Sequence, residues 1–186
     1  MDNIVAEMRQ VMREADCLAD AGQVSAALDR MASAISAELA DANPLVYCVM
    51  NGGLVTSGRL LPRLTFPLEV SYLHATRYGH ALQGGELLDW KVRPLADPRG
   101  RSVLVVDDIL DEGHTLQAIC DHLAAAGATR VLSAVLVHKD HPRKARPGLR
   151  ADFTGLDIAD RFLFGCGMDY KGYWRYSPGI YAVKGH

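Results

Sequence analysis

The sequence has few cysteines, and their spacing excludes the sites that cysteine-rich chains usually build. Four cysteines occur among 186 residues, at positions 17, 48, 120 and 166, and no two form a CxxC pair. This spacing supports neither a zinc site nor a disulfide framework. The sequence also has no signal peptide and no apolar run long enough to span a bilayer. We therefore expect a protein of the reducing cytoplasm, without a membrane partner.

An excess of charge of either sign is also missing. The formal net charge is −2, from 20 basic and 22 acidic residues, which gives no electrostatic reason to expect nucleic acid as a partner. Hydrophobic residues make up 49% of the chain and charged residues 23%, as is usual for a globular domain with a sizeable core. We predict one domain over residues 1–186, with N-terminal helices in 1–42, a core in 45–150 and a C-terminal part in 151–186.

One stretch, residues 103–115, carries most of the chemical information and reads VLVVDDILDEGHT. Its valine-rich start predicts a strand buried on both faces, and two adjacent carboxylates, Asp107 and Asp108, are expected to end that strand. Apolar residues then recur at helical spacing, at positions 116, 119, 120 and 123. The predicted order is therefore strand, acidic turn and helix.

This turn suits a sugar phosphate such as ribose 5-phosphate. A helix N-terminus offers unpaired N–H groups and the positive end of a dipole, Gly113 allows a close backbone approach, and Thr115 adds a hydroxyl. Asp107 and Asp108 would repel a phosphate, but they suit sugar hydroxyls, or a magnesium ion through water. A solvated acidic loop and a receiver domain are other interpretations, although a receiver domain needs no glycine-bearing phosphate turn.

The stretch resembles the phosphoribosyl pyrophosphate (PRPP) motif of the type I phosphoribosyltransferases. The resemblance implies an α/β fold with a mainly parallel sheet flanked by helices, a small C-terminal purine-binding hood and an N-terminal helical extension. It also implies PRPP contacts from Asp107, Asp108, Asp111, Glu112, Gly113, His114 and Thr115. Relatives often have Thr or Ser in place of Glu112, so we expect this carboxylate to point away from the phosphate while its backbone N–H contributes.

The N-terminal residues predict two helices without chemistry. Apolar side chains recur at helical spacing in residues 1–21, and Gly22 is expected to end this helix. Ser25 is expected to cap a second helix that runs to about Leu39. We interpret both helices as a scaffold or a subunit contact.

Residues 45–50 predict a buried strand, which Asn51, Gly52 and Gly53 follow. Adjacent glycines there allow a close backbone approach to an anion, although alone they more often mark a plain turn. Residues 50–53 resemble the pyrophosphate loop of the hypoxanthine-guanine members of the family, in which a non-proline cis peptide precedes the glycines. Many relatives carry Lys or Arg in place of Asn51, so this loop relies on main-chain donors and an amide.

Residues 54–64 predict a helix limited by Pro62, and residues 67–75 predict a strand. Residues 76–94 are polar and contain three glycines, which by itself is typical of a surface loop or hairpin. Between two phosphate turns, this segment can instead act as a lid that excludes water. Arg77 and Tyr78 resemble the Ser-Tyr pair of the family's mobile loop, with arginine in place of serine.

Residues 131–137 predict another buried strand, and Lys139 follows at its carboxyl end, where ligands of open α/β sheets bind. Lys139 can reach a carbonyl oxygen there. We interpret His138 and His141 as surface histidines. The basic residues at 143, 144, 146 and 150 are typical of a solvated loop, since the chain as a whole is not basic.

The segment 160–165, DRFLFG, is the second informative region. Phe162 can stack on a flat base while the main chain of Leu163 pairs with its edge and Arg161 donates to a 6-oxo group, although without context this is a short edge strand. Residues 157–170, 173–175 and 178–183 resemble the purine hood of the hypoxanthine-guanine members. The resemblance implies purine contacts from Phe162 and Leu163, contacts to the 6-oxygen from Lys139 and Arg161, a place near a second metal and the 2-position for Asp169, and a pyrophosphate contact from Arg175.

The implied activity is purine salvage, in which hypoxanthine or guanine and PRPP yield IMP or GMP and pyrophosphate. The implied cofactor is magnesium, held by Asp107, Asp108 and Asp169, and the implied general base at the purine N7 is Asp111. A homodimer or homotetramer is expected. A xanthine-preferring enzyme and a non-catalytic PRPP-sensing regulator on the same fold are the alternatives, and the choice among hypoxanthine, guanine and xanthine stays open.

Overall fold

The computed structural model describes residues 2–77 and 88–185. Its main element is a six-stranded sheet with the strand order β4-β3-β2-β5-β6-β7. All neighbouring strands are parallel except β3 and β4. The strands are β2 (Leu45–Val49), β3 (Glu69–Arg77), β4 (Leu88–Val92), β5 (Ser102–Leu110), β6 (Arg130–Asp140) and β7 (Phe153–Ala159). The carboxyl ends of the five parallel strands therefore meet at one edge, and the predicted α/β fold class is confirmed.

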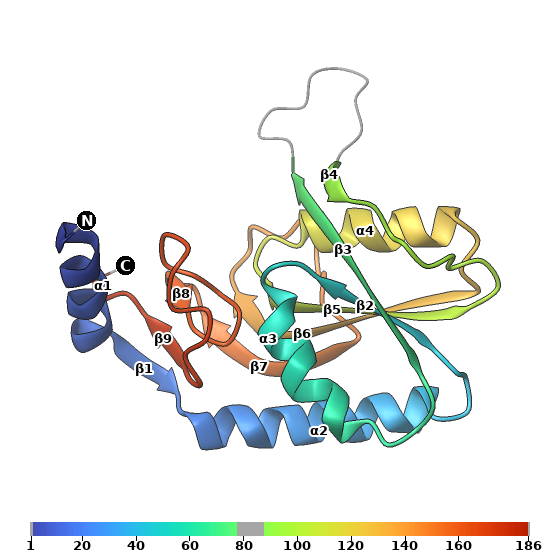
Figure 1. The fold of residues 1–186 in the computed structure, drawn as a ribbon, viewed down its shortest axis with the longest axis horizontal. Helices are drawn as coiled ribbons and strands as arrows, with labels where there is room; N and C mark the ends of the chain where they lie inside the picture. The colour runs from blue at the N-terminus through green and yellow to red at the C-terminus, as the bar shows by residue number, and fades with distance from the viewer. Residues whose placement is uncertain (1, 78–87, 186) are drawn as a thin grey trace.

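Helices cover both faces of this sheet (Figure 1). One face carries α2 (Ala21–Leu39) and α3 (Gly53–Leu60), and the other carries α4 (His114–Ala125). Strand β5 serves both cores, because Leu104 and Val106 pack on the α2 side while Val103 and Val105 pack on the α4 side. Burial on both sides is the reason for the uninterrupted apolar run at the start of β5.

A second, smaller sheet stands beside the carboxyl edge and forms the hood. It has the antiparallel order β1-β9-β8, from β1 (Asp16–Ala19), β8 (Leu163–Phe164) and β9 (Ile180–Ala182). Helix α1 (Asp2–Glu14) lies next to it in Figure 1. The hood therefore combines the C-terminal segment with a strand from the N-terminal segment.

The predicted boundaries of the N-terminal helices are wrong. Gly22 lies inside α2, and Asp20 caps this helix, since its Oδ1 accepts from the Gln23 backbone N at 2.8 Å. The Gln23 side chain accepts in turn from the Asp20 backbone N at 2.9 Å, which completes a capping box. Ser25 is helical, and its Oγ accepts from Arg63 at 2.8 Å. Residues 16–19 form a strand because β9, far away in sequence, offers them a pairing edge.

Two other boundaries differ from the prediction. Strand β5 continues through Asp107 and Asp108 to Leu110, because the long strand β6 supplies partners as far as His138. The helix predicted over residues 54–64 is α3 followed by a short 3-10 turn, Leu61–Arg63, which contains Pro62. Within residues 2–77 and 88–185, no helix is long and apolar enough to cross a membrane.

Candidate active site

Two adjoining cavities open at the carboxyl edge of the sheet. The larger, of about 540 Å³, lies between the loop after β2, the end of β5 and the start of α4. The smaller, of about 250 Å³, lies between the end of β5, β6 and the hood. Both are lined by Asp108, Ile109 and Asp111. A ligand in one cavity can therefore meet a ligand in the other along the last residues of β5.

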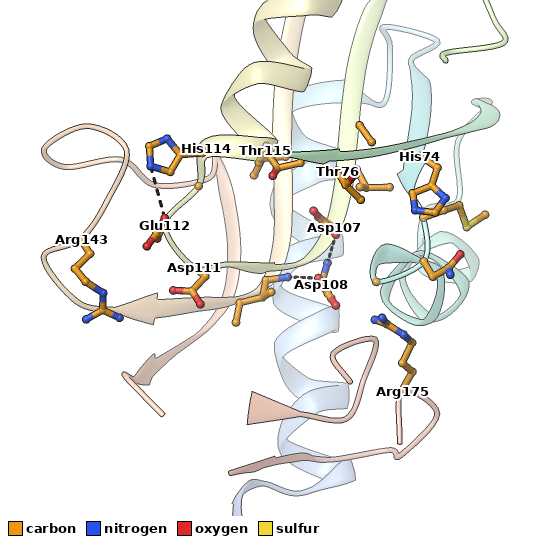
Figure 2. A pocket seen from close by; sticks show the side chains of 18 residues that line it. His74, Thr76, Asp107, Asp108, Asp111, Glu112, His114, Thr115, Arg143 and Arg175 are labelled. Carbon is orange, nitrogen blue, oxygen red and sulfur yellow. Dashed lines mark hydrogen bonds and ion pairs between the residues drawn. The ribbon is translucent and has the colours of Figure 1, made fainter. Parts of the chain in front are cut away.

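The acidic pair lies centrally in the larger cavity, with Asp111 and Arg143 to one side and Arg175 to the other (Figure 2). The backbone fixes both carboxylates, since Asp107 Oδ1 accepts from Asp108 N at 2.9 Å and Asp108 Oδ1 accepts from Ile109 N at 2.8 Å. Burial raises the pKa of both groups, and the charge of Asp108 raises that of Asp107 further. Hydroxyl donors or a cation would stabilise this pair in its ionised form.

The turn from β5 to α4 has the geometry of an anion site. Gly113 adopts a left-handed conformation, with φ of 87°, and caps α4. This backbone conformation disfavours any side chain, and a Cβ atom there would also lie 2.5 Å from Leu149 Cδ2. His114 and Thr115 follow and line the larger cavity, at the helix end whose N–H groups lack intrahelical partners. Glu112 also lines this cavity, and its carboxylate lies 3.6 Å from His114 Nε2.

The loop after β2 packs directly on β5. The Met50–Asn51 peptide is cis, as the resemblance implied. A Cβ atom on Gly52 would collide with the Asp108 carboxylate, and one on Gly53 would lie 2.5 Å from the Val106 carbonyl oxygen. Asn51 and Gly52 line the larger cavity, whereas Gly53 is buried at the start of α3.

Arg175 faces the acidic pair from the hood (Figure 2). Its guanidinium donates to the Gly167 carbonyl oxygen and to Asp169 Oδ1, each at 2.5 Å, and Asp169 Oδ2 accepts from Gly172 N at 2.6 Å. Its charge acts to lower the pKa of the acidic pair. Asp169 lines the smaller cavity. Among the described residues, no three Asp, Glu, His or Cys side chains gather closely enough to hold a metal ion by themselves. A role for Asp107, Asp108 and Asp169 toward magnesium stays a prediction.

The smaller cavity has a flat apolar wall and a cation that is largely buried. Phe162, Leu163 and Met168 line it with Lys139. The Phe162 ring is held edge-on against Tyr170, with centroids 5.8 Å apart, and the residue is 49% exposed. The Lys139 ammonium lies 2.9 Å from Asp111 Oδ2 and 3.4 Å from Asp160 Oδ1. This arrangement suits a planar heterocycle that carries a hydrogen-bond acceptor.

Arg161 is not at this cavity, contrary to the prediction. Its Nη2 donates to Asp16 Oδ2 at 2.8 Å and to the Val183 carbonyl oxygen at 3.1 Å. Arg161 lies in the bend between β7 and β8, and its guanidinium points to these partners, whereas Phe162 lines the smaller cavity. Arg161 therefore ties the N-terminal strand β1 to the end of the hood. Among the described basic residues, Lys139 is the one that lines the smaller cavity.

His138 in β6, and His141 and Lys144 after it, are not solvated, which corrects a second prediction. His138 and His141 are only 5% and 8% exposed. His141 Nε2 lies 2.6 Å from Asp111 Oδ1. The Lys144 ammonium donates to the carbonyl oxygens of Leu110, Asp111 and Lys139, at 3.2, 2.6 and 2.5 Å. A signal for His141 existed in the sequence, because this residue stands two positions after Lys139, which the sequence places at the carboxyl end of a strand.

Much of the predicted lid lies outside the residues that the structure describes. Strand β3 ends at Arg77, at the same edge as the cavities. The Arg77 side chain and Tyr78 lie outside the described residues. Their role stays a prediction.

Residues 14–171 match the family described as the phosphoribosyl transferase domain. The chain belongs to this family. It is 27% identical over 168 residues to the hypoxanthine-guanine phosphoribosyltransferase of Bacillus subtilis, covering 87% of this chain and 89% of that protein. It is 31% identical over 144 residues to the hypoxanthine-guanine-xanthine phosphoribosyltransferase of Tritrichomonas foetus, covering 77% and 78%.

Solved structures of phosphoribosyltransferases share the fold of this one. A hypoxanthine-guanine-xanthine phosphoribosyltransferase superposes with a TM-score of 0.81 at 25% identity, over 91% of this chain and 96% of that chain. A hypoxanthine phosphoribosyltransferase from Staphylococcus aureus superposes with a TM-score of 0.85, over 93% and 94%. At 20% identity, the second likeness shows the fold alone.

Proposed function

We propose that this phosphoribosyltransferase joins a 6-oxopurine, hypoxanthine or guanine, to the ribose 5-phosphate part of PRPP. The observation that carries the proposal is the pair of adjoining cavities that share Asp108 and Asp111. The larger offers an anion-binding turn, an acidic pair and Arg175, which match the phosphate, hydroxyl and pyrophosphate groups of PRPP. The smaller offers Phe162 and Lys139, which match a purine with a 6-oxygen. The names of the relatives from Bacillus subtilis and Tritrichomonas foetus support the same bases.

The proposed reaction is a substitution at the ribose C1′ atom. A bond forms between a purine ring nitrogen and C1′, while the bond from C1′ to the pyrophosphate oxygen breaks and its electron pair leaves with pyrophosphate. Asp111 receives the proton that the purine loses at N7, since its carboxylate lines both cavities. Asp107 and Asp108 hold the ribose hydroxyls and orient the sugar. Arg175 offsets charge on the leaving pyrophosphate.

Magnesium is the proposed cofactor. The described residues include no closed metal site, but Mg²⁺ usually binds one or two carboxylates and completes its shell with substrate phosphates and water. Asp107 and Asp108, two hard oxygen donors facing the larger cavity, fit that mode with PRPP present, and Asp169 fits it at the hood. When bound, the ion would supply charge neutralisation for pyrophosphate.

One alternative differs in the base that it accepts, and the other in what it does with PRPP. A xanthine-preferring enzyme would accept a further 2-oxo group near Asp169, and the relative from Tritrichomonas foetus carries xanthine in its name. A PRPP-sensing regulator would bind PRPP without transferring it. We further propose a homodimer or homotetramer acting in the cytoplasm.

A base panel tests the proposal and separates these alternatives. The enzyme is given PRPP and Mg²⁺ with hypoxanthine, guanine, xanthine or adenine, and product is followed by absorbance. Turnover of hypoxanthine or guanine supports the proposal, and preferential turnover of xanthine supports the first alternative. PRPP binding by calorimetry without turnover of any base supports the regulator and contradicts the enzyme.

A further inference from the structure

His141 is buried against the carboxylate that we place at the purine. Its side chain is 2% exposed, and its Nε2 lies 2.6 Å from Asp111 Oδ1. The other carboxylate oxygen, Oδ2, accepts from the Lys139 ammonium at 2.9 Å, and that side chain is 12% exposed. Asp111 itself is 46% exposed. Two well-buried donors therefore hold the two oxygens of a carboxylate that is open to the cavities.

The backbone defines which nitrogen of His141 carries the proton. The Arg143 backbone N–H donates to His141 Nδ1 at 3.1 Å. Because a backbone N–H can only donate, Nδ1 must hold a lone pair, and the ring proton is on Nε2. His141 is therefore a neutral donor to Asp111. The bond that selects this tautomer comes from the chain itself and does not depend on a ligand.

From this arrangement we infer that His141 is a positioning residue, which fixes the orientation of the Asp111 carboxylate for the purine proton. The inference rests on the proposed function, in which Asp111 is the proton acceptor. With one donor on each oxygen, rotation of the carboxylate about its Cβ–Cγ bond would break two hydrogen bonds. The remaining lone pairs then keep a constant direction toward the cavities that Asp111 lines.

The charges around Asp111 agree with this role. Burial acts to raise the pKa of Asp111, but hydrogen bonds from Lys139 and His141, together with the charge of Lys139, lower it below its ordinary value. The other charged groups nearby are also accounted for. The Lys144 ammonium donates to the backbone carbonyl oxygen of Asp111, and Arg143 and Glu112 line the larger cavity with Asp111. Asp160 pairs with Lys139. Removal of the His141 donor should therefore move the pKa of Asp111 upward.

Three variants test the positioning role. His141→Leu removes the donor and keeps an apolar bulk, and His141→Gln keeps a neutral N–H donor of similar reach. His138→Leu replaces a similarly buried histidine, which lies three residues earlier, in β6. We expect His141→Leu to lower kcat/KM for hypoxanthine roughly 10- to 100-fold, with the KM for PRPP nearly unchanged. We expect His141→Gln to recover most of that loss, and His138→Leu to stay within about threefold of the wild type.

The pH profile gives a readout that a purely structural role would not move. Asp111 must be ionised to accept the proton, so activity falls as the pH drops through its pKa. In His141→Leu, this acid limb should lie at higher pH than in the wild type, and His141→Gln should restore it. An unmoved acid limb in folded His141→Leu overturns the inference, as does a glutamine variant no better than leucine.

A measurement without turnover separates this inference from the proposed function. The carboxyl pKa of Asp111 can be followed by carbon-13 NMR in the free protein, in the wild type and in His141→Gln and His141→Asn. Asparagine has an amide too short to reach Asp111, so only this variant should raise the pKa. Equal values in all three proteins contradict the positioning role. A wild type that turns over no base contradicts the proposed function, and the NMR result still decides the contact.

Discussion

Gly167 of the hood lies directly against Gly52 of the loop after β2. A Cβ atom on Gly167 would collide with the Gly52 carbonyl oxygen and would lie 2.8 Å from Asp108 Cβ. Gly167 also has φ of 112°, a conformation that side chains rarely adopt. The hood and the loop after β2 thus meet backbone to backbone, next to the acidic pair of β5. Because the Arg175 guanidinium donates a hydrogen bond to the Gly167 carbonyl oxygen, this contact brings Arg175 opposite Asp108.

Gly167→Ala should separate the hood from this loop. The added methyl group meets backbone atoms that cannot move independently, so we expect a loss of roughly 2–4 kcal/mol in unfolding free energy and a weaker affinity for PRPP. Gly172→Ala is the matched control, because φ is 85° there while nothing lies within 4 Å of the added Cβ. Denaturant unfolding and PRPP calorimetry measure both effects. Equal losses in the two variants would show that conformational strain alone, and not the collision, is responsible.

Asp108→Asn should weaken the binding of PRPP. The amide keeps the oxygen that accepts from the Ile109 backbone but loses the charge, so we expect an affinity roughly 10- to 100-fold lower. Asp157→Asn is the control, since that carboxylate is 58% exposed and pairs with Arg150 on the surface. Isothermal calorimetry with PRPP and Mg²⁺ measures both. If the surface variant bound PRPP as poorly as Asp108→Asn, the ribose site would have to be elsewhere.

Removal of divalent metal should abolish turnover. Asp107 and Asp108 face the proposed substrate, which carries a phosphate and a pyrophosphate, and Arg175 is the cation of the described hood residues that lines the same cavity. Excess EDTA should stop product formation in the base panel, and added magnesium should restore it. The fold should survive the treatment, because no closed metal site occurs in the described residues; a thermal melt with and without EDTA checks this. Full activity in EDTA would remove magnesium from the proposed function.

Lys139 should decide between oxo and amino groups at the purine 6-position. Its ammonium can only donate, so adenine would place a second donor against it, at a cost of about 1–3 kcal/mol or roughly 10- to 100-fold in kcat/KM. Lys139→Met should lower kcat/KM for hypoxanthine and guanine while PRPP affinity is nearly kept. Arg161→Met is the control and should leave base preference unchanged, since that guanidinium bonds Asp16 and Val183. Comparable wild-type efficiency with adenine would contradict the assignment of Lys139.

Lys144→Met should destabilise the site although Lys144 belongs to a basic loop. Its ammonium donates to three carbonyl oxygens that join the ends of β5 and β6. We expect a loss of about 1.5–3 kcal/mol in unfolding free energy, together with lower activity, because Asp111 and Lys139 stand on those ends. Lys171→Met is the control, since that side chain is 57% exposed and pairs with Glu7. Equal stability of the two variants in urea would contradict this bracing role.

The sequence by itself determined the elements whose signals are local. A valine-rich run, the pair Asp107 and Asp108, and Gly113 predict a buried strand, an acidic pair and a glycine turn within about a dozen residues. Burial on two faces favours β-branched apolar residues, and a left-handed conformation favours glycine, so the composition reports both. The local signals of the glycines after β2 and of the Phe162 segment are weak, and these two were found through the resemblance to a family. Their roles toward PRPP and purine came from resemblance to a family and remain proposals here.

Only the tertiary structure decided which side chains face the site and which partners they take. Arg161 turns to Asp16, 145 residues away in sequence, whereas His141 and Lys144 turn inward to the end of β5. Residues 16–19 become a strand because β9 lies beside them. In each case the deciding energy comes from a hydrogen-bond partner distant in sequence, whereas composition and periodicity report only on a residue's neighbours along the chain.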